Sequence, residues 1–209
     1  MGLLDNISLY LITDDNRSNG RPVEEVVTAA IAGGVKMVQY RPWRISDEDY
    51  FFASMHLRRI TRKTGAFLLL NARPTIALKS GAQGVHVSKK SVKPTAARRR
   101  MIDTGIIGFS AHSLEEAIEA EADGADFITF SPVFPTESSS DPRPATGIDA
   151  LIEVVDKLSI PVFPLGGIGL KEIEQLKAAG IKRAAVVSAI TQSEDIEQAT
   201  RDIIAALES

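Results

Sequence analysis

The sequence predicts a single-domain (β/α)8 TIM barrel, an α/β fold, over residues 1–209. Short apolar segments alternate eight times with helical patterns, which is typical of parallel strands joined by crossover helices. No linker or change of composition divides the chain, and about 200 residues are enough for one compact barrel. An open, doubly wound sheet is the alternative, and the count of eight favours the barrel.

Composition and charge narrow the classes of function. The net charge is −3 and the pI is about 5.7, so the chain has no basic footprint for nucleic acid or for a membrane surface. The basic run at 98–100 lies in a helical pattern and is expected to be a solvated helix face. There is no cysteine, which excludes disulfides, thiolate metal ligands and thiol nucleophiles. With no run of 18 apolar residues and no secretory signal, we expect a cytoplasmic protein.

The first four strand–helix units follow from apolar runs and helix start signals. Pro22 suits the first turn of a helix that Gly33 ends, and Ser46 with the acidic residues after it is a typical N-cap. We expect strands at 7–13, 35–41, 66–71 and 84–87, and helices at 22–32, 46–63, 75–80 and 94–103.

The last four units carry similar signals. Ser113 and Glu116 match a capping box, and Gly180 ends the seventh helical pattern. A Ser/Pro-rich loop at 131–146 follows the sixth strand. We expect strands at 106–110, at 126–130, from residue 161 up to a run of glycines, and at 183–187. Their helices begin at 113, end at 158, and span 170–179 and 194–207.

Most of the predicted strands end in polar residues or glycines, where a purely structural explanation is weak. The carboxyl ends of barrel strands share one face, and barrel enzymes bind and react there. Glycines after the seventh strand and the helix start after the eighth suit a phosphate, because their N–H groups can approach an anion closely. The strand-end residues are Thr13, Asp14, Gln39, Arg41, Asn71, Arg73, His86, Ser110, His112, Thr136, Gly166, Gly167, Val187 and Ser188.

The chain resembles the thiamine phosphate synthase family, which includes the thiazole tautomerases, over nearly its full length. The matching runs are 9–14, 33–41, 81–86, 108–116, 124–136, 164–168 and 186–190. The resemblance implies thiamine biosynthesis with a phosphorylated thiazole as the small-molecule partner, and a homodimer is left open. The residues expected to bind substrate are Gln39, Arg41, Asn71, Arg73, His86, Ser110 and Thr136, and those expected to bind its phosphate are Gly166, Gly167, Val187 and Ser188.

The other half of the family's site departs from the pattern. Synthases of this family join a pyrimidine methyl diphosphate to a thiazole phosphate, and two aspartates hold Mg²⁺ there. Those aspartates fall on Ala72 and Ser91 in this chain, and two lysines of the same site fall on Trp43 and Ser139. Asp14, Glu137 and Asp141 do not stand at matching positions. We therefore expect no metal site and no resident cofactor.

His112 is the expected catalytic residue. It follows the fifth strand, in a run shared with the tautomerases, and an imidazole can move a proton near neutral pH. Alternatively, His112 caps the next helix and has only a structural role. His86 is expected to be a hydrogen-bonded wall of the site, and His56 a structural helix residue. Trp43 either fills the vacated diphosphate pocket or packs under the neighbouring loop.

Three functions remain open. The first is a thiazole tautomerase-like enzyme that keeps the thiazole-phosphate site and lacks the Mg²⁺–diphosphate site. The second is an active thiamine phosphate synthase with an altered diphosphate site. The third is a non-catalytic binder of a phosphorylated heterocycle. A sugar-phosphate epimerase is disfavoured, because its metal would need two histidines and two aspartates that the strand ends do not supply.

Overall fold

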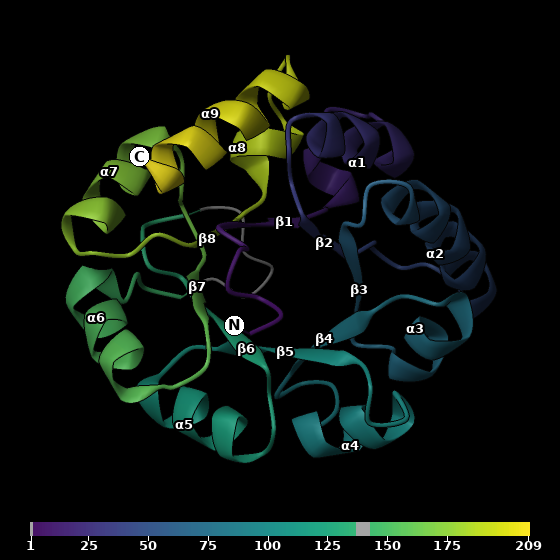
Figure 1. The fold of residues 1–209 in the computed structure, drawn as a ribbon, viewed down its shortest axis with the longest axis horizontal. Coiled ribbons are helices and arrows are strands. Elements are labelled where there is room, and N and C mark those ends of the chain that lie inside the picture. The colour runs from purple at the N-terminus through teal and green to yellow at the C-terminus, as the bar shows by residue number, and fades with distance from the viewer. Residues whose placement is uncertain (1, 137–142) are drawn as a thin grey trace.

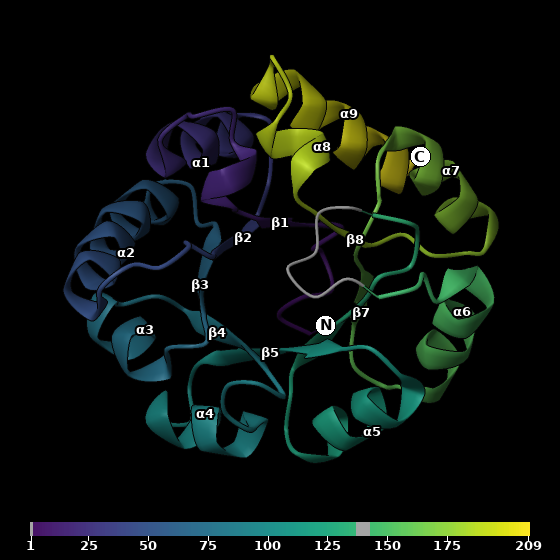
Figure 2. The same cartoon turned by 180° about the vertical axis from the view of Figure 1, so that it is seen from behind.

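A computed structural model describes residues 2–136 and 143–209 and confirms the predicted barrel class. Eight parallel strands form one sheet in the order β7-β6-β5-β4-β3-β2-β1-β8. The two end strands lie side by side, so the sheet curves round into a ring (Figures 1 and 2). The strands are β1 (Leu9–Ile12), β2 (Met37–Tyr40), β3 (Phe67–Asn71), β4 (Gly84–Ser88), β5 (Ile106–Ala111), β6 (Phe127–Phe130), β7 (Val162–Pro164) and β8 (Ala184–Val186).

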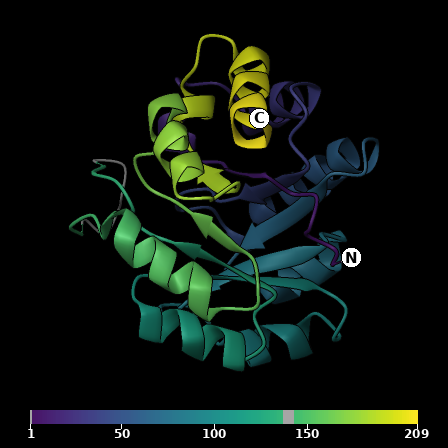
Figure 3. The same ribbon diagram turned by 60° about the vertical axis from the view of Figure 1, so that its left-hand side comes forward.

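The helices lie outside the strands, as the side view in Figure 3 shows. Ser46 and Ser113 cap their helices as predicted, because each side chain accepts a bond from an N–H in the first turn. The helices are α1 (Val23–Ala32), α2 (Asp47–Arg62), α3 (Pro74–Ser80), α4 (Pro94–Arg100), α5 (Leu114–Ala122), α6 (Gly147–Lys157), α7 (Leu170–Ala178), α8 (Ser188–Thr191) and α9 (Ile196–Glu208). None in the described part of the chain is long and apolar enough to cross a membrane.

Three local features differ from the expected elements. A short 3₁₀ helix, η1 (Asp15–Arg17), lies in the loop after β1, and the four-residue α8 follows β8. The basic helix α4 ends at Arg100 instead of Asp103. Ile102 and Asp103 both have positive φ, at 54° and 57°, so the backbone leaves the right-handed region there.

Ile102→Asn is expected to raise the free energy of unfolding by about 1 kcal/mol. A β-branched residue rarely adopts the left-handed region, whereas asparagine tolerates it. The Ile102 side chain is 64% exposed, so little packing is lost. Urea unfolding measures the change. Ile118→Asn on the exposed face of α5 is the control and should give no gain; an equal gain there would contradict the strain argument.

Two apolar clusters make up the core, one between the sheet and the helices and one inside the ring. Inside the ring, Tyr10, Phe127 and Phe163 meet edge to face, with centroids 5.3–5.9 Å apart. Gly108 of β5 makes room for them, since a Cβ there would overlap the Phe127 ring and lie 2.5 Å from His86 Nδ1. The inward-facing residues of this cluster are Tyr10, Ile12, Met37, Leu69, Ile106, Phe127, Phe163 and Ala185, with Leu4 and Ile7 packed beside them.

Candidate functional site

The parallel register brings the predicted strand-end residues to one end of the barrel. Asn71 is the last residue of β3, Gln39 and Ser110 are the second-last residues of β2 and β5, and His86 is the middle residue of β4. The remaining predicted site residues lie in the segments that follow these strands and β6, β7 and β8: Arg41, Arg73, His112, Thr136, Gly166, Gly167, Val187 and Ser188.

A chain of buried polar side chains lies directly beneath this end. Gln39 Nε2 donates to Tyr10 Oη at 2.7 Å, and Tyr10 Oη lies 3.3 Å from His86 Nδ1. On the other side of the imidazole, His86 Nε2 lies 2.9 Å from Ser110 Oγ and 3.3 Å from Thr129 Oγ1. Gln39, Tyr10, His86 and Thr129 are all buried. The barrel interior is therefore crossed by one hydrogen-bonded chain.

His86 stays neutral in this setting. Burial, together with a smaller contribution from the nearby charge of Arg41, lowers its pKa to about 3. A group with so low a pKa is a poor proton carrier near neutral pH. The geometry fits the expected wall residue. Sequence reasoning missed its partner Tyr10, although a single tyrosine within the aliphatic run of β1 was the available signal.

His112 is held by hydrogen bonds to Ser131 and Glu116 at the start of the β5–α5 connection. Its Nδ1 lies 2.7 Å from the Ser131 carbonyl oxygen, and its backbone N–H donates to Glu116 Oε2 at 3.0 Å. Because a carbonyl only accepts, Nδ1 carries the proton and a neutral His112 keeps its lone pair on Nε2. The half-buried imidazole is thus oriented as a base. Of the predicted capping box, the bond from the Glu116 N–H to Ser113 Oγ forms, whereas the Glu116 side chain accepts from His112, one residue before the N-cap.

Arg41 and Trp43 both contact Asp14, in the loop after β1. Asp14 is only 4% exposed and accepts from Arg41 at 3.4 Å and from Trp43 Nε1 at 3.1 Å. The backbone N–H of Asn16 adds a third bond at 3.1 Å. Of the two interpretations of Trp43, this contact favours packing against a neighbouring loop. The Arg41 side chain, 30% exposed, already has a carboxylate partner.

Arg73 turns toward the start of α2. Its guanidinium pairs with Asp47 at 2.8 Å, donates to the Ile45 carbonyl at 3.1 Å and lies 4.6 Å from the centre of the Tyr50 ring. Asp47 is 83% exposed, so the ion pair is weak and easily exchanged for another anion. Its role in substrate binding stays a prediction.

The Mg²⁺ that the family resemblance implies does not fit the donor set at the expected positions. Ala72 has no side-chain donor, and its N–H is bonded to the His86 carbonyl at 2.9 Å. Ser91 Oγ bonds the Ser88 carbonyl at 3.0 Å and accepts from the Ser88 N–H at 2.9 Å. Mg²⁺ prefers carboxylate oxygens, which neither residue supplies.

Two further observations concern the metal. Within 2–136 and 143–209, no three histidine or acidic side chains cluster as a metal site would require. Asp14 is engaged by a cation and an indole. Glu137, Asp141 and Ser139 lie outside the described residues. No step of a reaction is therefore assigned to a metal here.

The predicted phosphate cradle comprises the turn after β7 and the start of α8. Gly166 and Gly167 have φ of 97° and 65°, a conformation that favours glycine. They also pack on the loop after β6, since a Cβ on Gly166 would lie 2.8 Å from Pro132 Cβ and one on Gly167 would overlap the Pro135 carbonyl. Substitution of Gly167 therefore disturbs packing as well as any anion contact.

After β8, Val187 is the N-cap of α8 and Ser188 its first residue. The first hydrogen-bonded amides of this turn belong to Ile190 and Thr191, which both donate to the Val187 carbonyl. The N–H groups of Ser188 and Ala189 precede them, at the position where helix N–H groups have no partner inside the helix. Phosphate binding by these groups stays a prediction.

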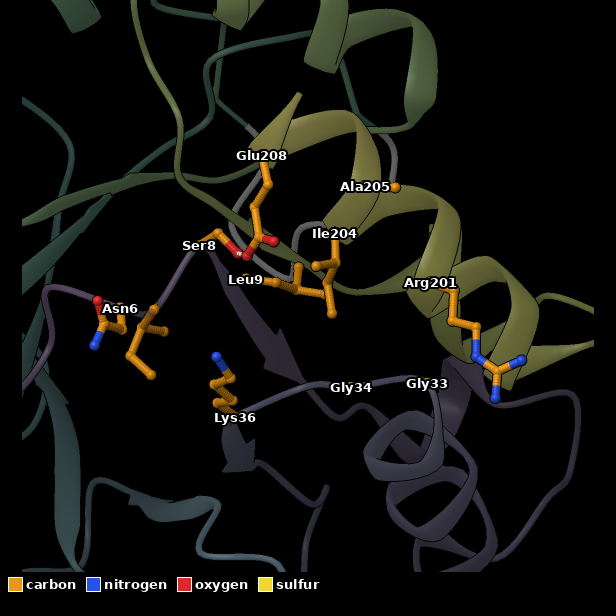
Figure 4. A pocket seen from close by; sticks show the side chains of 11 residues that line it. Asn6, Ser8, Leu9, Gly33, Gly34, Lys36, Arg201, Ile204, Ala205 and Glu208 are labelled. Atoms are coloured by element: carbon orange, nitrogen blue, oxygen red, sulfur yellow. Dashed lines mark hydrogen bonds between the residues drawn. The ribbon is translucent and has the colours of Figure 1, made fainter.

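Two cavities are lined by residues outside the predicted phosphate cradle. One of about 290 Å³ lies at the opposite end of the barrel, between β1, Gly33–Gly34 and α9, where Ser8 donates to Glu208 at 2.9 Å (Figure 4). Another of about 580 Å³ lies in the groove between α4 and α5 and includes Ser88, Ser91 and the Lys89–Glu116 ion pair. The first of these cavities lies on the barrel face whose residues generally contribute to stability rather than to catalysis.

Comparison with known proteins places this geometry in a family. A model of the family described as thiamine monophosphate synthase matches residues 9–190. A protein of Geobacter sulfurreducens named putative thiamine-phosphate synthase is 41% identical over 97% of this chain and 95% of its own. A thiamine-phosphate synthase of Methanocella arvoryzae is 39% identical over 93% and 92%.

Solved structures agree. The thiamine phosphate pyrophosphorylase of Pyrococcus furiosus superposes with a TM-score of 0.89 at 31% identity, covering 99% of this chain and 98% of that one. A 3-hexulose-6-phosphate synthase, 14% identical with a TM-score of 0.70, shares the fold alone. The chain belongs to the thiamine monophosphate synthase family.

Proposed function

We propose that this protein is an enzyme of thiamine biosynthesis that binds a phosphorylated thiazole at the carboxyl end of its barrel. The observation that carries the proposal is the close relation, at about 40% identity over nearly the whole chain, to proteins named thiamine-phosphate synthase. The polar residues support it: Gln39 and Ser110 form the two ends of the buried hydrogen-bonded chain, and Arg41 and His112 follow the same two strands, β2 and β5.

Condensation of a pyrimidine methyl diphosphate with a thiazole phosphate is the first candidate reaction. The names of the relatives favour it over the tautomerase, which the sequence placed first. The condensation releases pyrophosphate, so cations must stabilise charge on the leaving group. Arg41 and Arg73 are the arginines of this chain at the matching strand ends, and each would have to exchange its present carboxylate partner for the diphosphate.

Tautomerisation of a thiazole phosphate is the second candidate, favoured by one specific observation. His112 is oriented with its Nε2 lone pair available, which is what removal of a ring proton requires. The protonated imidazole would return that proton to another atom of the same ring. No leaving group forms, so the reaction tolerates the absence of acidic side chains at residues 72 and 91.

Two assays on the purified protein distinguish these functions. The first supplies both phosphorylated substrates with Mg²⁺ and measures thiamine phosphate and pyrophosphate. The second supplies the thiazole tautomer alone in deuterated buffer and follows conversion and deuterium uptake by NMR. Product in the first assay supports the synthase, and conversion in the second supports the tautomerase. Binding of the thiazole phosphate with neither reaction leaves the non-catalytic binder, and no binding at all refutes the proposal.

Removal of Mg²⁺ with EDTA is expected to change the affinity for a pyrimidine diphosphate less than threefold, as measured by calorimetry. The reason is that Ala72 and Ser91 supply no carboxylate to a metal-bound diphosphate. Ala72→Asp with Ser91→Asp is the matched comparison and should make binding depend on Mg²⁺. Micromolar binding by the wild type that requires Mg²⁺ would contradict this expectation.

A homodimer, which the sequence leaves open, is one oligomeric state to test. The exposed face of α2 carries Phe52, 59% exposed, and Met55, 48% exposed. Sedimentation of the full chain gives the oligomeric state directly.

A further inference from the structure

The buried chain of hydrogen bonds runs from Gln39 through Tyr10 and His86 to Ser110. We infer that Tyr10 is a positioning residue: its hydroxyl sets the direction of this chain, so that Ser110 offers a hydrogen-bond donor to the bound ligand. The inference about the ligand rests on the proposed function, whereas the direction of the chain can be measured without any ligand.

The direction follows from counting protons. Gln39 Nε2 donates to Tyr10 Oη at 2.7 Å, so the Tyr10 hydroxyl hydrogen is free to point elsewhere. Among the described residues, the other polar side-chain atom within hydrogen-bond distance of Tyr10 Oη is His86 Nδ1, at 3.3 Å, which then accepts it. A neutral imidazole carries one proton, so that proton is on Nε2 and is donated to Ser110 Oγ at 2.9 Å.

The consequence of this direction appears at Ser110, where the hydrogen-bonded chain ends. Ser110 accepts from His86, so its own hydroxyl hydrogen is not used by the imidazole. Ser110 is half-buried at the end of β5, where the site lies, whereas Thr129, the second neighbour of Nε2, is fully buried. Ser110 can therefore donate to an acceptor on the ligand, such as an unprotonated ring nitrogen or a phosphate oxygen. The opposite direction would use the Ser110 hydrogen on His86 and select a ligand donor instead.

Packing explains why Tyr10 can set this direction. Its ring is fully buried and meets the rings of Phe127, Phe163 and His86 at 5.3, 5.9 and 5.7 Å. The absence of a side chain on Gly108 admits the imidazole to this layer. The Tyr10 ring and its His86 partner are thus held in place, and phenylalanine would keep the ring while removing only the oxygen.

The direction is tested by ¹⁵N NMR of the full chain labelled at histidine. The sequence has three histidines, so His56→Gln and His112→Asn assign the signals. The expected wild-type result is a His86 ring protonated at Nε2 and unprotonated at Nδ1 across pH 6–8. A His86 ring protonated at Nδ1 would overturn the inference, whatever the protein binds.

The role of Tyr10 is tested by Tyr10→Phe, with Tyr40→Phe as the matched control. Tyr40 is buried in β2, and its side chain stacks on Tyr50 and takes no part in the hydrogen-bonded chain from Gln39 to Ser110. Tyr10→Phe is expected to populate the Nδ1-protonated form of His86 and to weaken thiazole phosphate binding by at least tenfold in calorimetry. Tyr40→Phe should leave the His86 signals unchanged. The thermal unfolding of both variants shows whether each is folded.

Two outcomes of the variant experiment would overturn the inference. One is a His86 ring in folded Tyr10→Phe that keeps its proton on Nε2. The other is a changed tautomer with unchanged thiazole phosphate affinity, which would show that the chain does not position Ser110. If Tyr10→Phe does not fold, Ser110→Ala replaces it, and an affinity loss under threefold would count against the inference. Failure of the wild type to bind thiazole phosphate refutes the proposed function and leaves the tautomer result in force.

Discussion

Replacement of His112 by asparagine is expected to lower the rate of thiazole tautomer conversion by about 10²–10⁴-fold, the usual contribution of a general acid–base group. Asparagine keeps a polar group near the Ser131 carbonyl but has no basic nitrogen that could take up a proton near neutral pH. Thiazole phosphate affinity should change little, because the predicted substrate contacts are made by other residues. NMR of the conversion in wild type and variant measures the rate.

His56→Gln is the control, since His56 lies exposed on α2 and should leave the rate unchanged. A His112→Asn variant that loses less than threefold, in a protein that does convert the thiazole, would place the proton transfer elsewhere. The condensation reaction should be less sensitive to the same substitution, because the thiazole nitrogen attacks without first losing a proton. A comparable loss in both reactions would indicate a structural role for His112 as a helix-cap residue.

Gly108→Ala is expected to lower the free energy of unfolding by about 3 kcal/mol. The added Cβ would overlap the Phe127 ring and lie 2.5 Å from His86 Nδ1, in a barrel interior with both neighbours fixed by packing. For a chain of this size, each kcal/mol corresponds to about 2–4 °C in the melting temperature. Calorimetry should therefore show a loss of roughly 6–12 °C.

Gly169→Ala is the matched control for this substitution. A Cβ at Gly169 would meet its nearest neighbour, Glu172 Oε2, at 3.4 Å, an ordinary contact. Its cost as an N-cap change should stay near 1 kcal/mol or below. Equal losses in the two variants would contradict the view that Gly108 makes room for His86. The Gly108→Ala protein should also lose the defined tautomer of His86.

The fold was predicted because its signals are local. Alternating apolar runs and caps such as Ser46 and Ser113 act within a few residues, so the strand and helix order follows from the sequence. The errors occur where a local signal was absent. Nothing near Ile102 marks a left-handed turn, and the four-residue α8 is too short to show a helical period.

The roles of individual strand-end residues were less predictable. Arg41 and Arg73 were expected as ligand contacts, and the structure shows that both already pair with a carboxylate. Trp43 could not be placed from its sequence neighbours, because its bonding partner Asp14 lies in another loop. The partners of each side chain depend on how neighbouring strands align, and that alignment is set by the whole barrel.

The sequence by itself determined the class of fold, the family and the replacement of the metal-binding aspartates by Ala72 and Ser91, because residue identity and short-range periodicity carry that information. Only the tertiary structure decided which buried side chains are joined by hydrogen bonds. Tyr10 and His86, for example, are 76 positions apart in the sequence. The tertiary structure also decided the engagement of Asp14 by Arg41, 27 positions away. Such contacts arise when parallel strands close into a ring, since hydrogen bonds between distant residues depend on strand register and burial rather than on neighbouring residues.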